Sequence, residues 1–133
     1  MESVIDTNIL VYATVEDSLF HEECLKKLNE LSKIYFPPTV IEEFVLVLRE
    51  LGISEDFIRK QVKVILEDPK VKVLSLNSKD LKDAIEILGR EKVSTRRFND
   101  KLILLSAKKN RLPIYTYDKK LREQSKKMGI ELL

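Results

Sequence analysis

Three aspartates stand where a fold of alternating strands and helices would present acidic groups for chemistry. Asp6 directly follows the short apolar run Ser3–Ile5, and Asp118 follows another at Pro113–Thr116. Asp100 stands where a loop is expected to enter a helix. An acid at a helix start is stabilised by the helix dipole, so taken alone such an acid has an ordinary structural explanation. Asp6 and Asp118 would both project at the carboxyl edge of a parallel sheet, where ligands of such folds bind.

A fourth acid, Glu43, is distinguished from its neighbour Glu42 by helical geometry. The sequence from Thr39 to Glu42 fits a capping box, in which Thr39 is the N-cap and Glu42 reaches back to its N–H. Glu43 falls at the edge of the apolar arc of the same helix, roughly 40° from Val47. A carboxylate at the edge of a buried face is costly unless it is paired or binds a cation, so Glu43 is the better candidate for a site.

Four acids gathered at one sheet edge would repel one another, and a divalent cation would remove that repulsion. Mg²⁺ and Mn²⁺ prefer oxygen ligands and keep several waters, so a few carboxylates around an open cleft suffice. Zinc is disfavoured because the chain has one histidine, His21, and one cysteine, Cys24, three residues apart on one expected helix. With a single histidine, a Ser-His-Asp or Cys-His nucleophilic mechanism is also poorly supported. No Gly-rich phosphate-binding loop is present in the sequence.

Short β-type runs alternate with longer helical patterns along the whole chain. Strands are expected at Ser3–Ile5, Ile34–Phe36, Val71–Leu76, Pro113–Thr116 and Ile130–Leu133. Helices are expected at His21–Ser32, Thr39–Leu51, Ser54–Glu67, Ser78–Gly89, Asp100–Ala107 and Lys119–Met128, with a loop at Ser94–Phe98. This alternation implies crossover connections, and we expect an α/β fold of three layers, α/β/α, around a central, mostly parallel sheet.

Length and composition set the class of protein. We expect the 133 residues to form a single domain, 1–133, because no linker, repeat or low-complexity segment interrupts them. Hydrophobic residues make up 44 % of the chain, which argues against intrinsic disorder. No apolar run approaches the ~20 residues of a membrane span, and no signal peptide is visible. A single cysteine fits a reducing cytoplasm best.

The net charge of +2 is too small to indicate a nucleic-acid binder by itself, but its distribution is uneven. From Lys92 onward the chain holds twelve Lys and Arg residues against four Asp and Glu. Arg96 and Arg97 lie in this basic third, just before Asp100. This basic third has two explanations that composition does not separate, a nucleic-acid-binding face and an ordinary solvated, lysine-rich surface.

Four short motifs, each with one of the acids, follow one another along the chain: Val4–Tyr12, Thr39–Leu48, Phe98–Asp100 and Thr116–Leu121. In this order they resemble the motifs of the PIN-domain ribonucleases, and most closely those of the VapC-type toxins of prokaryotic toxin–antitoxin pairs. Glu43 aligns with the acid of the second motif. The resemblance runs over essentially the whole chain and implies the PIN-like form of the three-layer fold.

The resemblance also implies a mechanism, metal-dependent hydrolysis of RNA phosphodiesters by an activated water. Asp6, Glu43, Asp100 and Asp118 would be the catalytic acids and would hold one or two Mg²⁺ or Mn²⁺ ions. Asn8 and Thr116 would orient a carboxylate or a water. Arg96 and Arg97 would contact the RNA backbone.

Partners follow from the same resemblance: RNA, a second copy in a homodimer, and a small antitoxin protein with a segment in the acidic cleft, with no membrane. The apolar helices between Thr39 and Glu67 are the expected dimer surface. Two alternatives stay open, an inactive PIN-like module for RNA binding or assembly and an RNA-processing nuclease with no toxin role. Receiver domains and haloacid-dehalogenase phosphatases are disfavoured, because Asp6 is the only acid after the first strand and Asn8 stands where the phosphatases have a second aspartate.

Overall fold

Four short parallel strands form the centre of the protein, in the spatial order β3–β2–β1–β4. The structure is a computed structural model that describes residues 1–133. Strand β1 pairs with β2 on one side and with β4 on the other, and β2 also pairs with β3. The strands are β1 (Glu2–Ile5), β2 (Lys33–Phe36), β3 (Val71–Val73) and β4 (Ile114–Tyr115).

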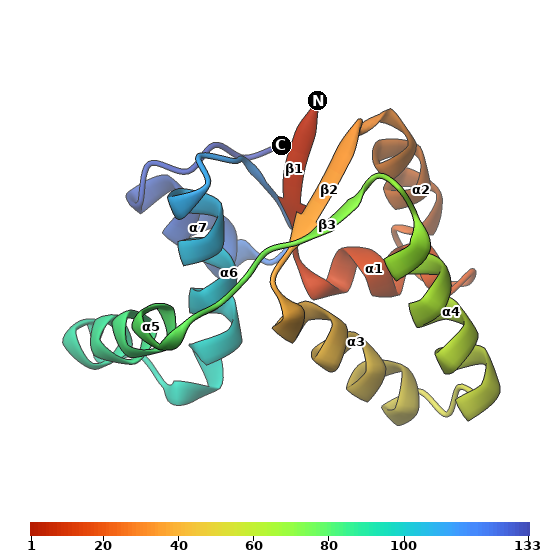
Figure 1. The fold of residues 1–133 in the computed structure, drawn as a ribbon, viewed down its shortest axis with the longest axis horizontal. Helices are drawn as coiled ribbons and strands as arrows, with labels where there is room; N and C mark the ends of the chain where they lie inside the picture. Colours follow the sequence, from red (N-terminus) through yellow and green to blue (C-terminus); the bar gives the residue numbers. More distant parts are fainter.

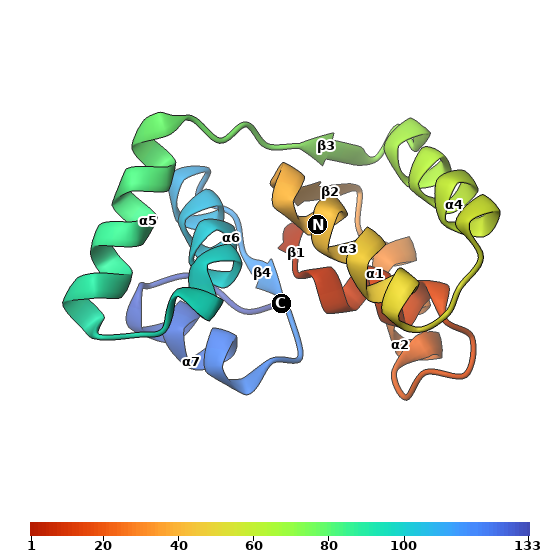
Figure 2. The same cartoon turned by 90° about the horizontal axis from the view of Figure 1, so that it is seen from below.

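Seven helices cover the sheet and complete three α/β/α layers, as the sequence predicts. Helices α1 to α4 lie on one side of the sheet and α5, α6 and α7 on the other (Figure 1). The segment that joins β3 to α5 crosses between the two groups (Figure 2). The helices are α1 (Thr7–Thr14), α2 (His21–Glu30), α3 (Pro38–Glu50), α4 (Glu55–Glu67), α5 (Ser78–Glu91), α6 (Phe98–Lys109) and α7 (Lys119–Lys127). None of them combines the length and the apolar character that a membrane-spanning helix requires.

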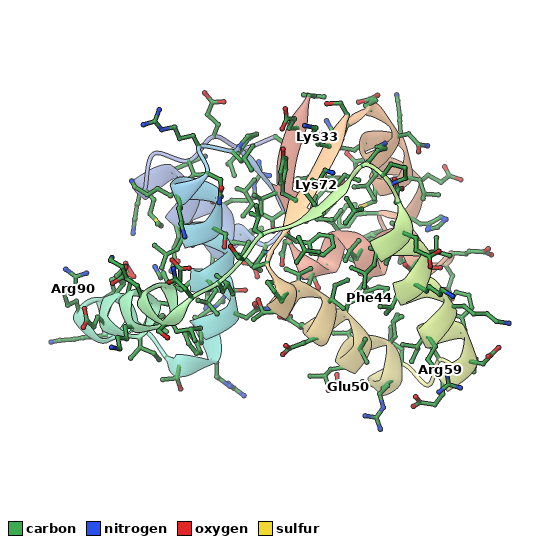
Figure 3. All side chains as sticks on the ribbon, viewed as in Figure 1. Lys33, Phe44, Glu50, Arg59, Lys72 and Arg90 are labelled. Atoms are coloured by element: carbon green, nitrogen blue, oxygen red, sulfur yellow. The ribbon has the colours of Figure 1, made fainter.

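The middle of the sheet is buried on both faces, as expected for parallel strands covered by helices. In β1 the side chains of Ser3, Val4 and Ile5 are all buried. Phe44 of α3 is fully buried in the hydrophobic core and points inward from α3, whereas the charged side chains of Glu50, Arg59 and Arg90 lie at the periphery (Figure 3). At their carboxyl ends the strands therefore pass directly from the buried core to the edge of the sheet, where the following helices begin.

Three of the predicted strands are shorter in the structure. The expected strand Pro113–Thr116 is reduced to the two residues of β4. The expected strand Val71–Leu76 ends at Val73, because β3 is an edge strand that pairs only with the four-residue β2. The expected strand Ile130–Leu133 is reduced to one parallel bridge between Leu132 and Ile114. The expected loop Ser94–Phe98 contains a 3₁₀ turn, Thr95–Arg97.

Helix α1 has no counterpart among the sequence predictions. Its sequence is apolar along most of its length, and Thr7, Ile9, Leu10 and Val11 are all buried. A helix buried nearly all round lacks the amphipathic period by which helices are recognised in a sequence. Its β-branched residues also have a lower helix propensity than unbranched ones.

The predicted capping box at Thr39 and Glu42 is wrong. Helix α3 begins at Pro38, which occupies the first helical turn, and Pro37 is the N-cap. Because proline already has a helical φ and no N–H to satisfy, the helix starts before Thr39 and places that residue inside it. The Thr39 hydroxyl is buried without a hydrogen-bond partner, and Glu42 is exposed. A capping box forms instead at Asn77, at the start of α5.

A buried lysine on α6 connects the three helices on its side of the sheet. The side chain of Lys101 is only 1 % exposed. Its Nζ donates to Glu91 Oε1 at the end of α5, at 2.7 Å, and to Gln124 Oε1 on α7, at 3.2 Å. An ammonium group removed from water is tolerated because these two oxygens solvate it. Lys101 therefore fixes α6 relative to α5 and α7.

Removing the charged partner of Lys101 is expected to destabilise the protein. The substitution Glu91→Ala leaves a buried ammonium with one neutral acceptor, at a cost of about 2–3 kcal/mol in the free energy of unfolding. Urea unfolding measures this cost, and Glu86→Ala, an exposed glutamate on the same helix, is the control. The double variant Lys101→Met/Glu91→Ala should recover most of the stability, and equal losses for Glu91→Ala and Glu86→Ala would contradict the interpretation.

Candidate active site

An open cavity of about 530 Å³ lies at the carboxyl edge of the sheet. Its lining residues come from the starts of α1, α6 and α7 and from Glu43 of α3. No hydrophobic residue lines it. Its walls carry four acids, three cations and two amides: Asp6, Glu43, Asp100, Asp118, Arg96, Arg97, Lys120, Asn8 and Asn99. The structure thus brings together every site residue predicted from the sequence except Thr116, which lies buried beside the cavity.

Asp6 is at the centre of this arrangement because of the register between β1 and β4. Val4 pairs with Ile114 and Ile5 with Tyr115, so Asp6 and Thr116 follow side by side at the ends of their strands. The backbone N–H of Asp6 donates to the Tyr115 carbonyl oxygen at 3.1 Å. Thr116 Oγ1 donates to Asp6 Oδ2 at 2.8 Å. One carboxylate oxygen of Asp6 is therefore held by the protein.

Burial changes the acidity of Asp6. Only 5 % of the residue is exposed, and this burial raises the pKa of its carboxyl group to about 6. The hydrogen bond from Thr116 acts in the opposite direction, while the negative charges of Asp100 and Glu43 raise the pKa further. The Asp6 carboxylate is thus destabilised by desolvation and by its acidic neighbours, and a bound cation would relieve both.

Asp118 is oriented by the first turn of α7. It is the N-cap of that helix, and its Oδ1 accepts the N–H of Leu121 at 3.1 Å. Its own backbone N–H donates to Thr116 Oγ1 at 3.0 Å. Thr116 therefore connects Asp6 and Asp118 through a single hydroxyl group. The second carboxylate oxygen of Asp118, Oδ2, lies 3.6 Å from Arg97 Nη1.

Aromatic packing fixes the segment after β4 that carries Thr116 and Asp118. Tyr117, between these two residues, stacks on Phe20 with ring centroids 4.1 Å apart and planes within 8° of parallel. Its hydroxyl lies 3.1 Å from that of Tyr115. Alternation along an extended segment directs Tyr115 and Tyr117 to the side opposite Thr116 and Asp118. The tyrosines thus anchor the segment while the polar residues face the site.

Asp100 lies in the first turn of α6 and is paired with a cation from the same loop. Its Oδ2 is 2.7 Å from Arg97 Nη1, and the same nitrogen is 3.6 Å from Asp118 Oδ2. Burial raises the pKa of the Asp100 carboxyl group, as does the charge of Asp118, and the Arg97 guanidinium opposes them. Arg97 is therefore in contact with acids on two different helices.

Glu43 reaches the cavity from α3, where it is half-buried at the edge of the apolar face, as the helical geometry predicts. Its Oε2 accepts a hydrogen bond from Nδ2 of Asn99, at the start of α6. Asn99 Oδ1 is buried and has no partner. This bond connects the helices that carry Glu43 and Asp100.

Sequence reasoning missed two residues of the cavity, Asn99 and Lys120. Asn99 lies within the motif Phe98–Asp100, of which only Asp100 is singled out by the sequence. A polar residue at this position can nevertheless face an acid that lies opposite the start of the helix. Lys120 was one of many lysines in the basic third of the chain. Its position two residues after the N-cap Asp118 was the available signal, since a side chain in the first helical turn lies beside the cap.

The residues around the cavity suit a hard divalent cation. Every potential ligand is a carboxylate or amide oxygen, the ligand type that Mg²⁺ and Mn²⁺ prefer. The cavity has room for waters besides the protein ligands, which Mg²⁺ in particular retains. In this structure the acids do not form a closed group of three or more metal ligands. These oxygens are suitable ligands for such an ion, and Arg97 lies between two of the acids, Asp100 and Asp118.

The family model for the PIN domain matches residues 3–127 of this chain. No curated protein gives a significant sequence match.

Solved structures share the fold at low sequence identity. Mycobacterium tuberculosis VapC20, described as a sarcin–ricin loop cleaving toxin, aligns with a TM-score of 0.81 at 14 % identity over 93 % of this chain and 95 % of its own. Rickettsia felis VapBC2, bound to a DNA fragment from its promoter, aligns with a TM-score of 0.67 at 17 % identity over 100 % and 98 %. A toxin–antitoxin complex from Klebsiella pneumoniae aligns with a TM-score of 0.63 at 14 % identity over 89 % and 88 %.

The raised pKa of Asp6 predicts that Asp6→Asn stabilises the metal-free protein at neutral pH. The difference between the ordinary value of 3.8 and about 6 corresponds to about 3 kcal/mol. Because the folded-state value is the higher one, this cost is fully present above pH 6. It is relieved as the pH falls from 6 to 4 and the carboxylate takes up its proton.

Chemical unfolding in the presence of a chelator at several pH values checks this expectation. The advantage of Asp6→Asn over wild type should be up to about 3 kcal/mol at pH 8 and should disappear near pH 4. Asp17→Asn, an exposed aspartate in the α1–α2 loop, is the control and should show no such change. An advantage of Asp6→Asn that is the same at every pH would contradict the assigned cause.

Proposed function

Because the chain belongs to the PIN domain family, we propose that it is a metal-dependent endoribonuclease and the toxin of a toxin–antitoxin pair. One observation carries the catalytic part of this proposal. Four carboxylates from four separate segments converge on one cavity that has no hydrophobic lining. Gathering four acids costs stability in the absence of a cation, so the arrangement is understandable as a site built for one.

Asp6, Glu43, Asp100 and Asp118 would hold one or two Mg²⁺ or Mn²⁺ ions. Bound ions of this kind supply an activated water for attack on a phosphodiester and stabilise charge on the leaving oxygen. The chain itself contributes orientation before any ion arrives. Thr116 holds Asp6 and the backbone of Asp118, Asn99 holds Glu43, and the first turn of α7 holds Asp118.

The cations of the cavity suit a polyanionic substrate. Arg96 and Lys120 line the cavity, are exposed and form no ion pair within the protein. Both are therefore available to the phosphates on either side of a scissile bond. RNA is the substrate that the family assignment favours, and Asn8 on α1 would orient a carboxylate or a water at the same edge.

The toxin role rests on the structural likeness to proteins described as toxins or toxin–antitoxin complexes. On this basis an antitoxin protein is the expected partner, with a segment that occupies the acidic cavity. A homodimer is the expected assembly. Leu46, Leu51 and Phe57 on and beside α3 and α4 are exposed and apolar, which suits the contact surface proposed for these helices.

The substitution Asp100→Asn is expected to abolish RNA cleavage and leave RNA binding largely intact. It removes one acid from the site without adding bulk, while Arg96 and Lys120 remain available to the backbone. Cleavage of a pool of structured RNAs in Mg²⁺ or Mn²⁺, with binding measured in a chelator, tests this. Asp17→Asn is the control and should cleave as wild type does. Binding without cleavage by wild type and Asp100→Asn alike would instead favour the inactive-module alternative.

Metal alone is expected to stabilise the wild-type protein against unfolding. A ligand that binds only the native state contributes about 2.7 kcal/mol at 100 times its dissociation constant. Thermal unfolding in a series of Mn²⁺ concentrations, without RNA, measures this contribution. The stabilisation should be much smaller for Asp100→Asn and unchanged for Asp17→Asn. Equal stabilisation of all three proteins would place the ion outside the cavity.

A further inference from the structure

One of the three cations in the cavity is already bound to the acids. Arg97 Nη1 lies 2.7 Å from Asp100 Oδ2 and 3.6 Å from Asp118 Oδ2. All three side chains are only partly exposed, at 26 %, 23 % and 31 %, so water screens these contacts less than it screens a surface ion pair. A single guanidinium thus neutralises acids from α6 and from the start of α7.

The local backbone brings Arg97 to this position. Residues Thr95–Arg97 form a 3₁₀ turn that leads directly into α6, and Arg97 is the N-cap of that helix. Arg97 and Asp100 are therefore three residues apart across the first turn, the spacing at which side chains of a helix meet. Because Arg97 and Asp100 are held close together by the same turn of one chain, little further ordering is needed to form their contact.

The neighbouring cations behave differently. Arg96 belongs to the same turn but is exposed and makes no ion pair. Its backbone N–H donates a hydrogen bond to Ser94 Oγ. Lys120 is exposed and forms no ion pair either. The contact with the acids is therefore specific to Arg97 and not a general consequence of positive charge beside the cavity.

A guanidinium and a metal ion cannot share these oxygens. Mg²⁺ requires ligand oxygens at 2.0–2.1 Å, whereas Arg97 Nη1 already occupies the approach to Oδ2 of Asp100 at hydrogen-bonding distance. Two positive groups so close together would also repel each other. A metal ion that takes Oδ2 of Asp100 or Oδ2 of Asp118 as a ligand must therefore displace Arg97. Asp6 and Glu43 are held by neutral groups, Thr116 and Asn99, and no such exchange is needed there.

We propose that Arg97 is an internal counter-ion that competes with the divalent metal for Asp100 and Asp118. In the metal-free protein it stabilises the two acids, and metal binding displaces it toward the open cavity. There its charge becomes available to a substrate phosphate, so the displaced side chain is a positioning residue for the nucleic acid. This inference rests on the proposed function only in taking a divalent cation as the ligand of the cavity.

The experiment compares Mn²⁺ affinity without RNA in the wild-type protein and in Arg97→Met, Arg97→Lys and Arg96→Met, by isothermal titration calorimetry. Arg97→Met keeps a long side chain but removes the competitor, and should bind Mn²⁺ at least about tenfold more tightly than wild type. Arg96→Met removes the same charge from the adjacent position and should change the affinity by less than about twofold, because that charge is exposed and screened. Arg97→Lys should stay closer to wild type than Arg97→Met, since it retains a cation.

Thermal unfolding in a chelator supplies a readout independent of the metal. Arg97→Met should melt at a lower temperature than Arg96→Met, because Asp100 and Asp118 lose their counter-ion. Saturating Mn²⁺ should reverse this order.

Three outcomes would overturn the inference. If wild type binds Mn²⁺ and Arg97→Met binds it equally tightly or more weakly, the inference is overturned and the proposed function stays intact. An equal gain in Mn²⁺ affinity for Arg96→Met would show that the loss of any positive charge near the cavity has this effect, and not the loss of the Arg97 contact. The absence of Mn²⁺ binding in both wild type and Arg97→Met would overturn the inference together with the metal dependence of the proposed function.

Discussion

The parallel pairing of β1 with β4 is the interaction on which the candidate site depends. It joins Val4 to Ile114, 110 positions apart in the sequence, and it alone places Asp6 beside Thr116. The chain runs outward from β1 to β2 and β3 and then returns to the other side of β1, so the order of strands reverses between β1 and β4. Loops on the two sides of such a point diverge and leave room for a cavity.

Around this point the four acids are oriented by four different kinds of partner, and this variety explains how the cavity tolerates them. A buried carboxylate without a partner would be neutralised or would destabilise the fold. Each acid here keeps at least one oxygen engaged while the cavity stays open to a ligand. The partners are the Thr116 hydroxyl for Asp6, the Asn99 amide for Glu43, the Arg97 guanidinium for Asp100 and the Leu121 N–H for Asp118.

The sequence allowed the layers, the parallel sheet and the grouping of the acids to be predicted, because parallel strands present their carboxyl ends at one edge. Helix α1 escaped prediction since its burial removes the amphipathic period, and the capping box at Thr39 failed since Pro38 starts the helix earlier. The contacts of Asn99 with Glu43 and of Arg97 with Asp118 depend on how α6 faces α3 and α7. That orientation is decided by tertiary packing, including the buried Lys101, and no local pattern encodes it.

The wide spacing of the four acids along the chain has a consequence for synthesis. A protein emerges from the ribosome with its N-terminal part first. Asp6 and Glu43 are therefore made long before Asp100 and Asp118, and β1 lacks its β4 neighbour until more than a hundred further residues have been added. A nascent chain that has not yet reached Asp100 therefore holds only half of the acids of the cavity. Under the proposed function, such a chain would be unable to cut the message that encodes it.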